Sequence, residues 1–225
     1  GEGLPNHKSL YTASAKAYTF APGQDSLEVR LVAKEANGAE VVKRYRFRKG
    51  SYEIEVAYEL KNAGEKAVAP YAYFQFLRDG NPPSQEASQT NAFVGVATFT
   101  GPAVYTEESK FVKVDFKDID KGKQSHVKKA KDGWIALVQH YFVSAWAPKS
   151  GVEREYFMSR VSDNLYTMGV IVPVGAVAPG EAELHRLHVP VAEVVPGEGG
   201  HALRGIAVAV DVEAGGGPPH RARLP

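Results

Sequence analysis

The sequence predicts an all-β fold built from antiparallel strands. Between residues 27 and 60, apolar and charged residues alternate with a period of two, which is typical of half-buried strands. Helical periodicity is nearly absent, and Gly, Pro, Asn and Asp turns separate the remaining apolar runs. We therefore expect a sandwich with at most short helices, and 225 residues are enough for one domain with a large core.

The alternation predicts a hairpin with a two-residue turn at Lys49 and Gly50. Apolar residues then meet apolar residues on one face, and cations meet anions on the other. The predicted pairs are Phe47 with Tyr52, Tyr45 with Ile54, Arg46 with Glu53, and Arg44 with Glu55.

Asn37 and Gly38 also resemble a tight turn. A two-residue loop there would place Val29 opposite Arg46 and so mix the two faces. The sequence therefore favours a three-residue loop or a bulge.

Basic residues gather in this region, and they permit two interpretations. They could form a patch for phosphate or lipid, or an ion-pair ladder with Glu53, Glu55 and Glu59, and we favour the ladder. The basic residues are Lys43, Arg44, Arg46, Arg48 and Lys49.

Further strands are expected along the rest of the chain. Residues 79–91 contain no large apolar side chain and predict a long exposed loop, either a contact surface or a plain connection. The expected strands are 67–78, 93–99, 111–116, 124–130, 133–147, 154–160, 165–173 and 182–189.

Composition excludes several classes of function. The net charge of +1 gives no strong field for nucleic acid or anionic lipid, and the absence of cysteine excludes disulfides and thiol catalysis. No apolar run approaches the roughly 20 residues that span a bilayer, and the first residues do not resemble a signal peptide. We expect this fragment to be soluble.

The stretch 133–148 holds both tryptophans, Trp134 and Trp146, in one apolar run that ends at Pro148. We expect a buried strand with both indoles in or beside the core between the sheets.

This stretch resembles a signature of the first large periplasmic domain of the bacterial YidC/Oxa/Alb insertase family. That signature reads Gly-Trp-aliphatic-Ala-x-aliphatic-Gln-His-Tyr-Phe-x-x-Ala-Trp-x-Pro. The resemblance extends through residues 62–66, 99–106 and 110–118, and it covers roughly residues 4–189.

The resemblance implies a twisted antiparallel β-supersandwich, similar to sugar-mutarotase folds, in residues 1–189. Part of the family's amino-terminal strands is expected to be missing. The family performs insertion with membrane helices outside this chain, so the resemblance implies a non-enzymatic domain without cofactor or metal. The implied location is the periplasmic face of the inner membrane, in a multi-pass protein. The implied partners are accessory subunits of the Sec translocon and nascent inner-membrane proteins.

Residues 190–225 are rich in Gly, Pro, Ala and Arg and do not resemble the family. Natural divergence, an altered reading frame and sequence added by cloning all remain open for this tail.

Two sets of residues are candidates for binding. Exposed cations could contact a protein partner, although an ordinary solvated face is the simpler reading; these are Lys121, Lys123, Lys128, Lys129 and Lys131. Aromatic residues and one histidine could line a cleft for a peptide or saccharide, although buried aromatics more often stabilise a core; these are Tyr71, Tyr73, Trp134, His140, Tyr141 and Trp146.

No catalytic or metal site is predicted. Nucleophile elbows and phosphate-binding loops are absent from the sequence, and His185 and His188 would point to opposite faces of a strand. The main functional hypothesis is a protein-interaction module. A carbohydrate-binding or sugar-epimerising sandwich is the alternative, and a passive spacer is a third possibility.

Overall fold

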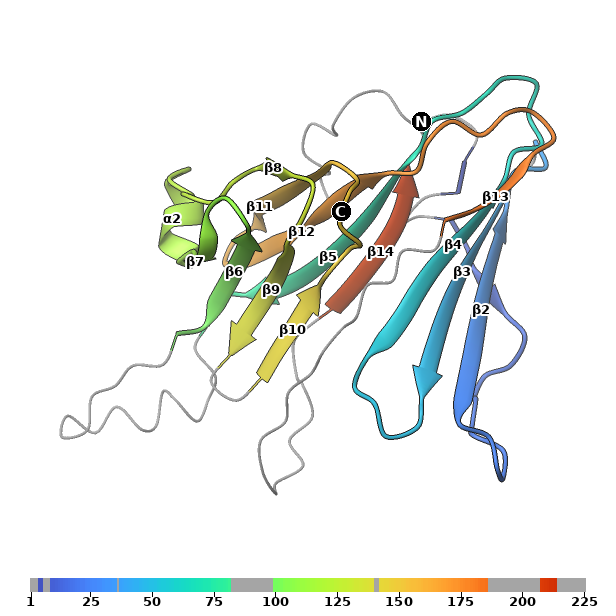
Figure 1. Ribbon diagram of the computed structural model, residues 1–225, viewed down its shortest axis with the longest axis horizontal. Helices are drawn as coiled ribbons and strands as arrows, with labels where there is room; N and C mark the ends of the chain where they lie inside the picture. Colours follow the sequence, from blue (N-terminus) through green and yellow to red (C-terminus); the bar gives the residue numbers. More distant parts are fainter. Residues whose placement is uncertain are drawn as a thin grey trace.

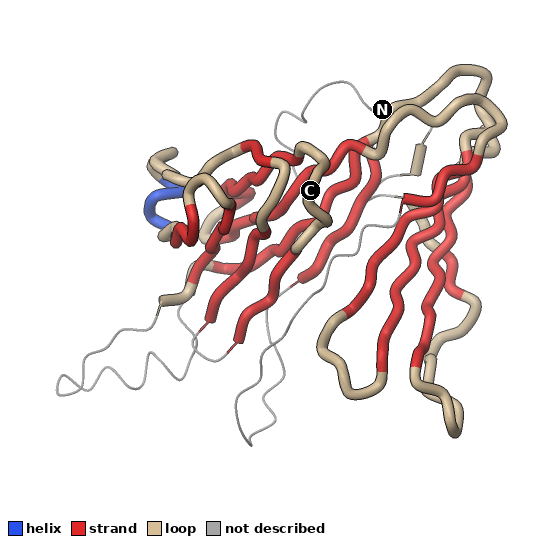
Figure 2. The backbone as a smooth tube through the Cα atoms, viewed as in Figure 1, coloured by secondary structure: helices blue, strands red, loops and turns tan. Residues whose placement is uncertain are grey.

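The regular secondary structure of the described chain in the computed structural model is almost entirely β-strand, which confirms the expected all-β, antiparallel sandwich (Figure 1). The structure describes residues 4–5, 9–35, 37–81, 99–139, 142–185 and 207–213, with the backbone alone for 183–185 and 207–213. Strands dominate this part, and its one helix, α2 (Phe116–Asp120), is short (Figure 2).

The first sheet carries the alternation seen in the sequence. One face supplies Val41, Val56, Tyr58 and Leu60 to the core, and most side chains of the other face are charged. Its strand order is β1 (Thr12–Ala13), β2 (Ser26–Lys34), β3 (Glu40–Arg48), β4 (Ile54–Lys61) and β13 (Ala182–His185).

The second and third sheets lie one over the other, and the first sheet stands beside them (Figure 1). The order of the second sheet is β10 (Phe142–Trp146), β9 (Trp134–Gln139), β6 (Gly101–Thr106) and β7 (Lys110–Lys113). The order of the third sheet is β14 (Ala207–Glu213), β5 (Tyr71–Asp79), β12 (Leu165–Pro173), β11 (Arg154–Ser162) and β8 (Lys129–Ala130).

An aromatic junction joins the three sheets. Trp146 is fully buried, and its ring centroid lies 5.3 Å from those of both Phe74 and Phe76. Tyr58 meets Phe74 edge to face at 5.9 Å, which extends the contact into the first sheet. Such aromatic pairs add specific geometry to the burial of large apolar surfaces.

The predicted register of the hairpin at Lys49 and Gly50 is wrong by two residues. Phe47 pairs with Ile54 and not with Tyr52, which is 63% exposed in the connecting loop. The other observed pairs are Tyr45 with Val56, Arg46 with Glu55, and Arg44 with Ala57.

A local turn explains this shift. The Ser51 amide donates to the Arg48 carbonyl at 3.2 Å, and the Ser51 hydroxyl accepts from the Glu53 amide at 3.0 Å, so residues 49–53 form a longer loop. Because side chains alternate with a period of two, a slip of two residues leaves both faces as predicted.

Of the two forms expected at Asn37 and Gly38, a three-residue loop or a bulge, the structure has the loop. Lys34 pairs with Glu40, and the Glu35 amide donates to the Ala39 carbonyl at 2.9 Å. Val29 therefore lies opposite Tyr45, on the apolar side of the sheet.

The expectation of one strand over 133–147 is wrong, because this stretch forms the hairpin of β9 and β10. Ile135 pairs with Trp146 and faces the core, so the adjacent Trp134 points to the opposite face of the second sheet. The predicted core position is thus confirmed for Trp146 and wrong for Trp134. His140 and Tyr141 lie outside the described residues.

Several other boundaries differ from the sequence expectations. Strand β6 was not expected, the 111–116 strand ends at Lys113, and the 124–130 segment is extended in β8 alone. Strand β12 matches the prediction. The expected 182–189 strand is described to His185. Most of the 79–91 loop and of the 93–99 strand lies outside the described residues, as does residue 188.

Part of the tail joins the third sheet. Residues 207–213 form β14, which pairs with all but the last two residues of β5. The remainder of 190–225 lies outside the described residues.

Gly133, just before β9, lies in close contact with the backbone of β6. Its φ is +87°, and an added Cβ would lie 1.9 Å from the Tyr105 carbonyl oxygen. Gly122 has φ +66° but open space around it. We expect Gly133→Ala to lower the free energy of unfolding by about 3 kcal/mol or more, and Gly122→Ala by about 1 kcal/mol. Urea unfolding of both variants measures the difference, and equal losses would contradict the close approach.

Candidate functional site

The five predicted lysines lie on one segment, residues 121–131, which we call the lysine segment. Lys121 follows α2, and Lys129 lies on β8 at the edge of the third sheet. All five side chains are exposed, and within the described part of the chain none of them forms an ion pair. The structure therefore brings these residues together, as a row of free cations.

Tyr156 of β11 fixes the middle of the lysine segment. Its amide donates to the Lys128 carbonyl at 2.7 Å, and its hydroxyl donates to the Asp132 carbonyl at 2.8 Å. Burial raises the pKa of Tyr156 to about 12, so the hydroxyl remains a donor at neutral pH. The cations thus project from a backbone that is bonded to a sheet.

Arg154 fixes the end of the segment. Its guanidinium is buried and donates to the carbonyls of Lys131 at 2.9 Å, Pro148 at 2.7 Å and Val152 at 3.1 Å, and to that of Lys149. The Arg154 side chain therefore links the segment after β10 to the segment after β8. Such a hub needs the several donors that a guanidinium provides.

His126 lies beneath the lysine segment. Its Nε2 donates to the Tyr156 carbonyl at 3.3 Å, while Nδ1 is buried without a partner among the described residues. Burial lowers the pKa of His126, and the nearby Lys128 cation acts in the same direction. The imidazole is therefore neutral at neutral pH.

Chemically, this site offers charge and rigidity. Exposed ammonium groups on an ordered backbone suit contact with carboxylates of a partner protein. In the described part of the chain, no three His, Asp or Glu side chains lie together as metal ligands would. No described helix has the length and hydropathy required to cross a bilayer.

The four predicted cleft aromatics that the structure describes do not gather in one place. Trp146 is in the core, whereas Trp134 stacks on Tyr105 at 5.8 Å on the outer face of the second sheet. Tyr73 contacts Phe157 at 6.4 Å on the outer face of the third sheet, and Tyr71 is half-buried at the start of β5. The strand period separates the two tryptophans, because Trp134 is the neighbour of Ile135, the cross-strand partner of Trp146.

The sequence interpretation did not single out Arg154, Tyr156 or His126. Each acts mainly through main-chain carbonyls of distant residues. Such partners carry no side-chain signature, so no pattern in the sequence could have identified them.

The family model described as the YidC periplasmic domain matches residues 1–189. The membrane protein insertase YidC of Nitrosomonas europaea is 48% identical over 183 residues, which are 80% of this chain and 29% of that protein. The corresponding protein of Aromatoleum aromaticum is 50% identical over 182 residues, with 81% and 32% covered. The chain thus spans about 30% of the length of these relatives.

Among solved structures, the GH36 α-galactosidase AgaA from Geobacillus stearothermophilus superposes with a TM-score of 0.42 at 12% identity. This match covers 84% of this chain and 26% of the galactosidase. A likeness this distant carries no argument about activity.

His126 should make stability sensitive to mild acid. Because its pKa is lowered in the folded state, the unfolded chain binds a proton more readily below the ordinary value of 6.5. The contribution of the neutral His126 to the free energy of unfolding is fully present above pH 6.5 and is lost as the pH falls through the pKa of His126 in the folded state. We expect the unfolding free energy of His126→Gln, which keeps a donor for Tyr156, to fall less steeply with acid. Urea unfolding of both proteins at a series of pH values below neutrality tests this prediction. An identical decrease of the unfolding free energy with pH in the two proteins would contradict it.

Proposed function

The chain belongs to the YidC periplasmic domain family, and from this premise we propose that it is a protein-interaction module of a membrane protein insertase. In this proposal the domain is not an enzyme. It assists the insertion and folding of inner-membrane proteins by contact, while catalysis of insertion belongs to other parts of the longer protein.

The proposed location is the periplasmic face of the bacterial inner membrane. The proposed partners are accessory subunits of the Sec translocon and nascent inner-membrane proteins. The family description, which names a periplasmic domain, and the relatives' name of membrane protein insertase support the setting.

The lysine segment is the observation that carries the interaction role. Its five cations have no intramolecular carboxylate within the described chain, so a partner's acidic groups would not have to displace an existing ion pair. The bonds from Arg154 and Tyr156 hold the main chain at Lys131 and Lys128, which lowers the entropic cost of ordering this backbone on docking. Electrostatic complementarity of this kind favours fast and specific association.

The carbohydrate alternative has less support. Sugar epimerisation requires an acid and a base within hydrogen-bond reach of one ring. The buried His126 contacts a main-chain carbonyl and lies near a lysine. Of the aromatic residues proposed for a cleft, the described Tyr73, Trp134 and Trp146 lie on separate faces of the sheets.

Charge reversal tests the interaction role. We expect Lys128→Glu, Lys129→Glu and Lys131→Glu together to weaken a pull-down of translocon subunits, because each reversal turns attraction into repulsion. Stability should change by less than about 1 kcal/mol per site, since the side chains are exposed. Lys16→Glu, Lys49→Glu and Lys66→Glu together serve as a control with the same net charge, and this control should bind normally.

Other outcomes would contradict the placement. Equal loss in the control would indicate an effect of net charge alone. If the lysine variant binds normally while a variant with Tyr71→Ala and Tyr73→Ala does not, the interface lies along β5. Failure of the unaltered chain to capture any translocon subunit would favour the passive spacer.

A further inference from the structure

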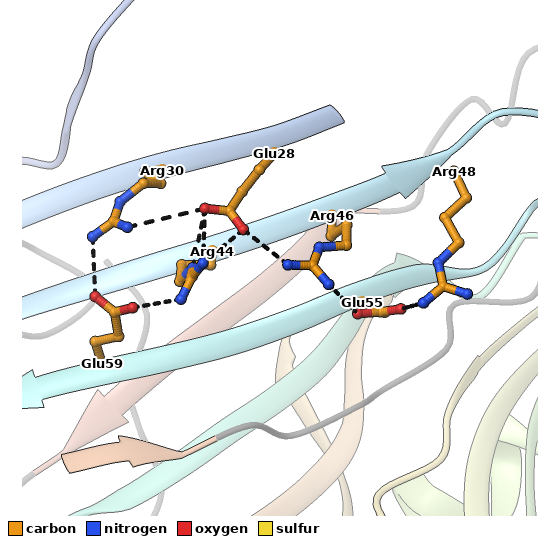
Figure 3. A network of polar contacts seen from close by, with 7 residues as sticks. All are labelled: Glu28, Arg30, Arg44, Arg46, Arg48, Glu55 and Glu59. Atoms are coloured by element: carbon orange, nitrogen blue, oxygen red, sulfur yellow. Dashed lines mark hydrogen bonds and ion pairs between the residues drawn. The ribbon is translucent and has the colours of Figure 1, made fainter. Parts of the chain in front are cut away.

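A network of arginine and glutamate side chains covers the outer face of the first sheet (Figure 3). Arg44 is at its centre, with nitrogens 2.8 Å from Glu28 and 2.6 Å from Glu59. We call the outer surface of this sheet the arginine face. The network consists of Glu28, Arg30, Arg44, Arg46, Arg48, Glu55 and Glu59.

Strand register explains why this network forms. Arg30 and Arg44 are direct cross-strand partners, an arrangement that repels when it stands alone. Glu59, on the next strand, bridges the two, at 3.0 Å from Arg30 and 2.6 Å from Arg44. The ion-pair ladder expected from the sequence is therefore present, although through Glu55 and Glu59 and not through Glu53.

Cations and carboxylates lie at different depths in this network. The guanidinium side chains of Arg30, Arg46 and Arg48 are 48%, 45% and 61% exposed. Glu28 and Glu59 are each 28% exposed, and Glu55 is 13% exposed. The carboxylates thus lie close to the sheet, and guanidinium groups form the outermost layer that a partner would meet.

The face also carries more cations than carboxylates. Register places six cations on it, Lys34 and Lys61 included, against the four carboxylates of Glu28, Glu40, Glu55 and Glu59. Among the cations of this face that form ion pairs, Lys34 has the most exposed side chain, at 69%. The ion pairs therefore leave a net positive surface.

The chemistry of this surface fits phosphate. Guanidinium groups bind phosphate with paired hydrogen bonds, and they are more weakly hydrated than ammonium groups. Strands β2, β3 and β4 pair without a register shift, so the cations spread over a continuous surface and do not line a pocket. A spread of this kind suits many phosphate groups in one plane.

Two exposed aromatic residues border the same sheet. Tyr52 lies in the loop between β3 and β4, and Phe20, 39% exposed, lies in the segment before β2. The Lys49 amide donates to the Asp25 carbonyl at 2.9 Å, which holds that loop beside the start of β2. Aromatic side chains next to cations favour the interface between lipid headgroups and acyl chains.

We propose that the arginine face rests on an anionic phospholipid surface, with headgroup phosphates bound by Arg30, Arg46 and Arg48. This inference relies on the proposed function only in that a membrane lies nearby. Lipid vesicles contain no translocon subunit. The lipid proposal can therefore fail while the interaction role holds, and the interaction role can fail while the lipid proposal holds.

Vesicle sedimentation of the whole chain tests the proposal. We expect it to bind vesicles of phosphatidylcholine and phosphatidylglycerol in a ratio of about two to one, and to bind pure phosphatidylcholine weakly. Binding should fall with added salt because the charges are exposed. Arg30→Gln, Arg46→Gln and Arg48→Gln together should weaken binding at least about tenfold, since each cation near such a surface is worth up to roughly fivefold.

A control removes three charges elsewhere. Lys66→Gln, Lys117→Gln and Lys149→Gln, at exposed positions outside both charged surfaces, should together reduce vesicle binding by less than about threefold if the arginine face is the contact surface. Equal weakening by both triple variants would overturn the assignment to this face. So would equal, salt-insensitive binding to both kinds of vesicle, or absence of binding by the unaltered chain.

Glu55→Gln keeps the test decisive if the arginine variant unfolds. Glu55 pairs with Arg46 and Arg48, and its replacement removes a negative charge beneath them. We expect binding to anionic vesicles up to about fivefold tighter. Unchanged or weaker binding by a folded Glu55→Gln variant would overturn the proposal. Loss of an acidic translocon partner in the arginine variant, without vesicle binding, would instead make the face a protein interface.

Discussion

The architecture depends on the packing of one indole ring among three sheets. Trp146 ends β10, yet its ring contacts two residues of β5, and one of these contacts Tyr58 of β4. Its Nε1 is buried without a partner in the described chain, which costs about 1 to 3 kcal/mol, but burial of so large an apolar ring offsets that cost. Once this ring is placed, the alternation along each neighbouring strand determines which side chains face the core and which face outward.

The two charged surfaces differ in how their cations are arranged. Those of the lysine segment lack ion pairs in the described chain and are held through main-chain bonds beneath them. Those of the arginine face are held by carboxylates that lie closer to the sheet. The first arrangement leaves charge available for the carboxylates of a partner, and the second presents planar donors at fixed spacing. A chain with a net charge of +1 thus carries two local positive surfaces, which its composition alone did not indicate.

The sequence predicted the fold class and the faces of the first sheet, because a period of two directly reports which side chains are buried. It could not give the register at Lys49 and Gly50, since a slip of two residues satisfies the same pattern and the Ser51 turn decides between the two. It predicted which lysines would be exposed, but not the Arg154 and Tyr156 bonds that hold their backbone. The continuous apolar run 133–147 concealed a hairpin, because apolar residues on both sides of a strand remove the alternation that marks a single face.

The two tryptophans, separated to opposite faces of one sheet, give the molecule two distinct optical reporters. The emission of Trp146, in an apolar core, lies at shorter wavelength and is shielded from aqueous quenchers. Trp134, stacked on Tyr105 and near the 48% exposed Phe111, responds to solvent and to anything that docks on the outer face of the second sheet. Intrinsic fluorescence can therefore distinguish loosening of the core from an event at the surface in a single spectrum.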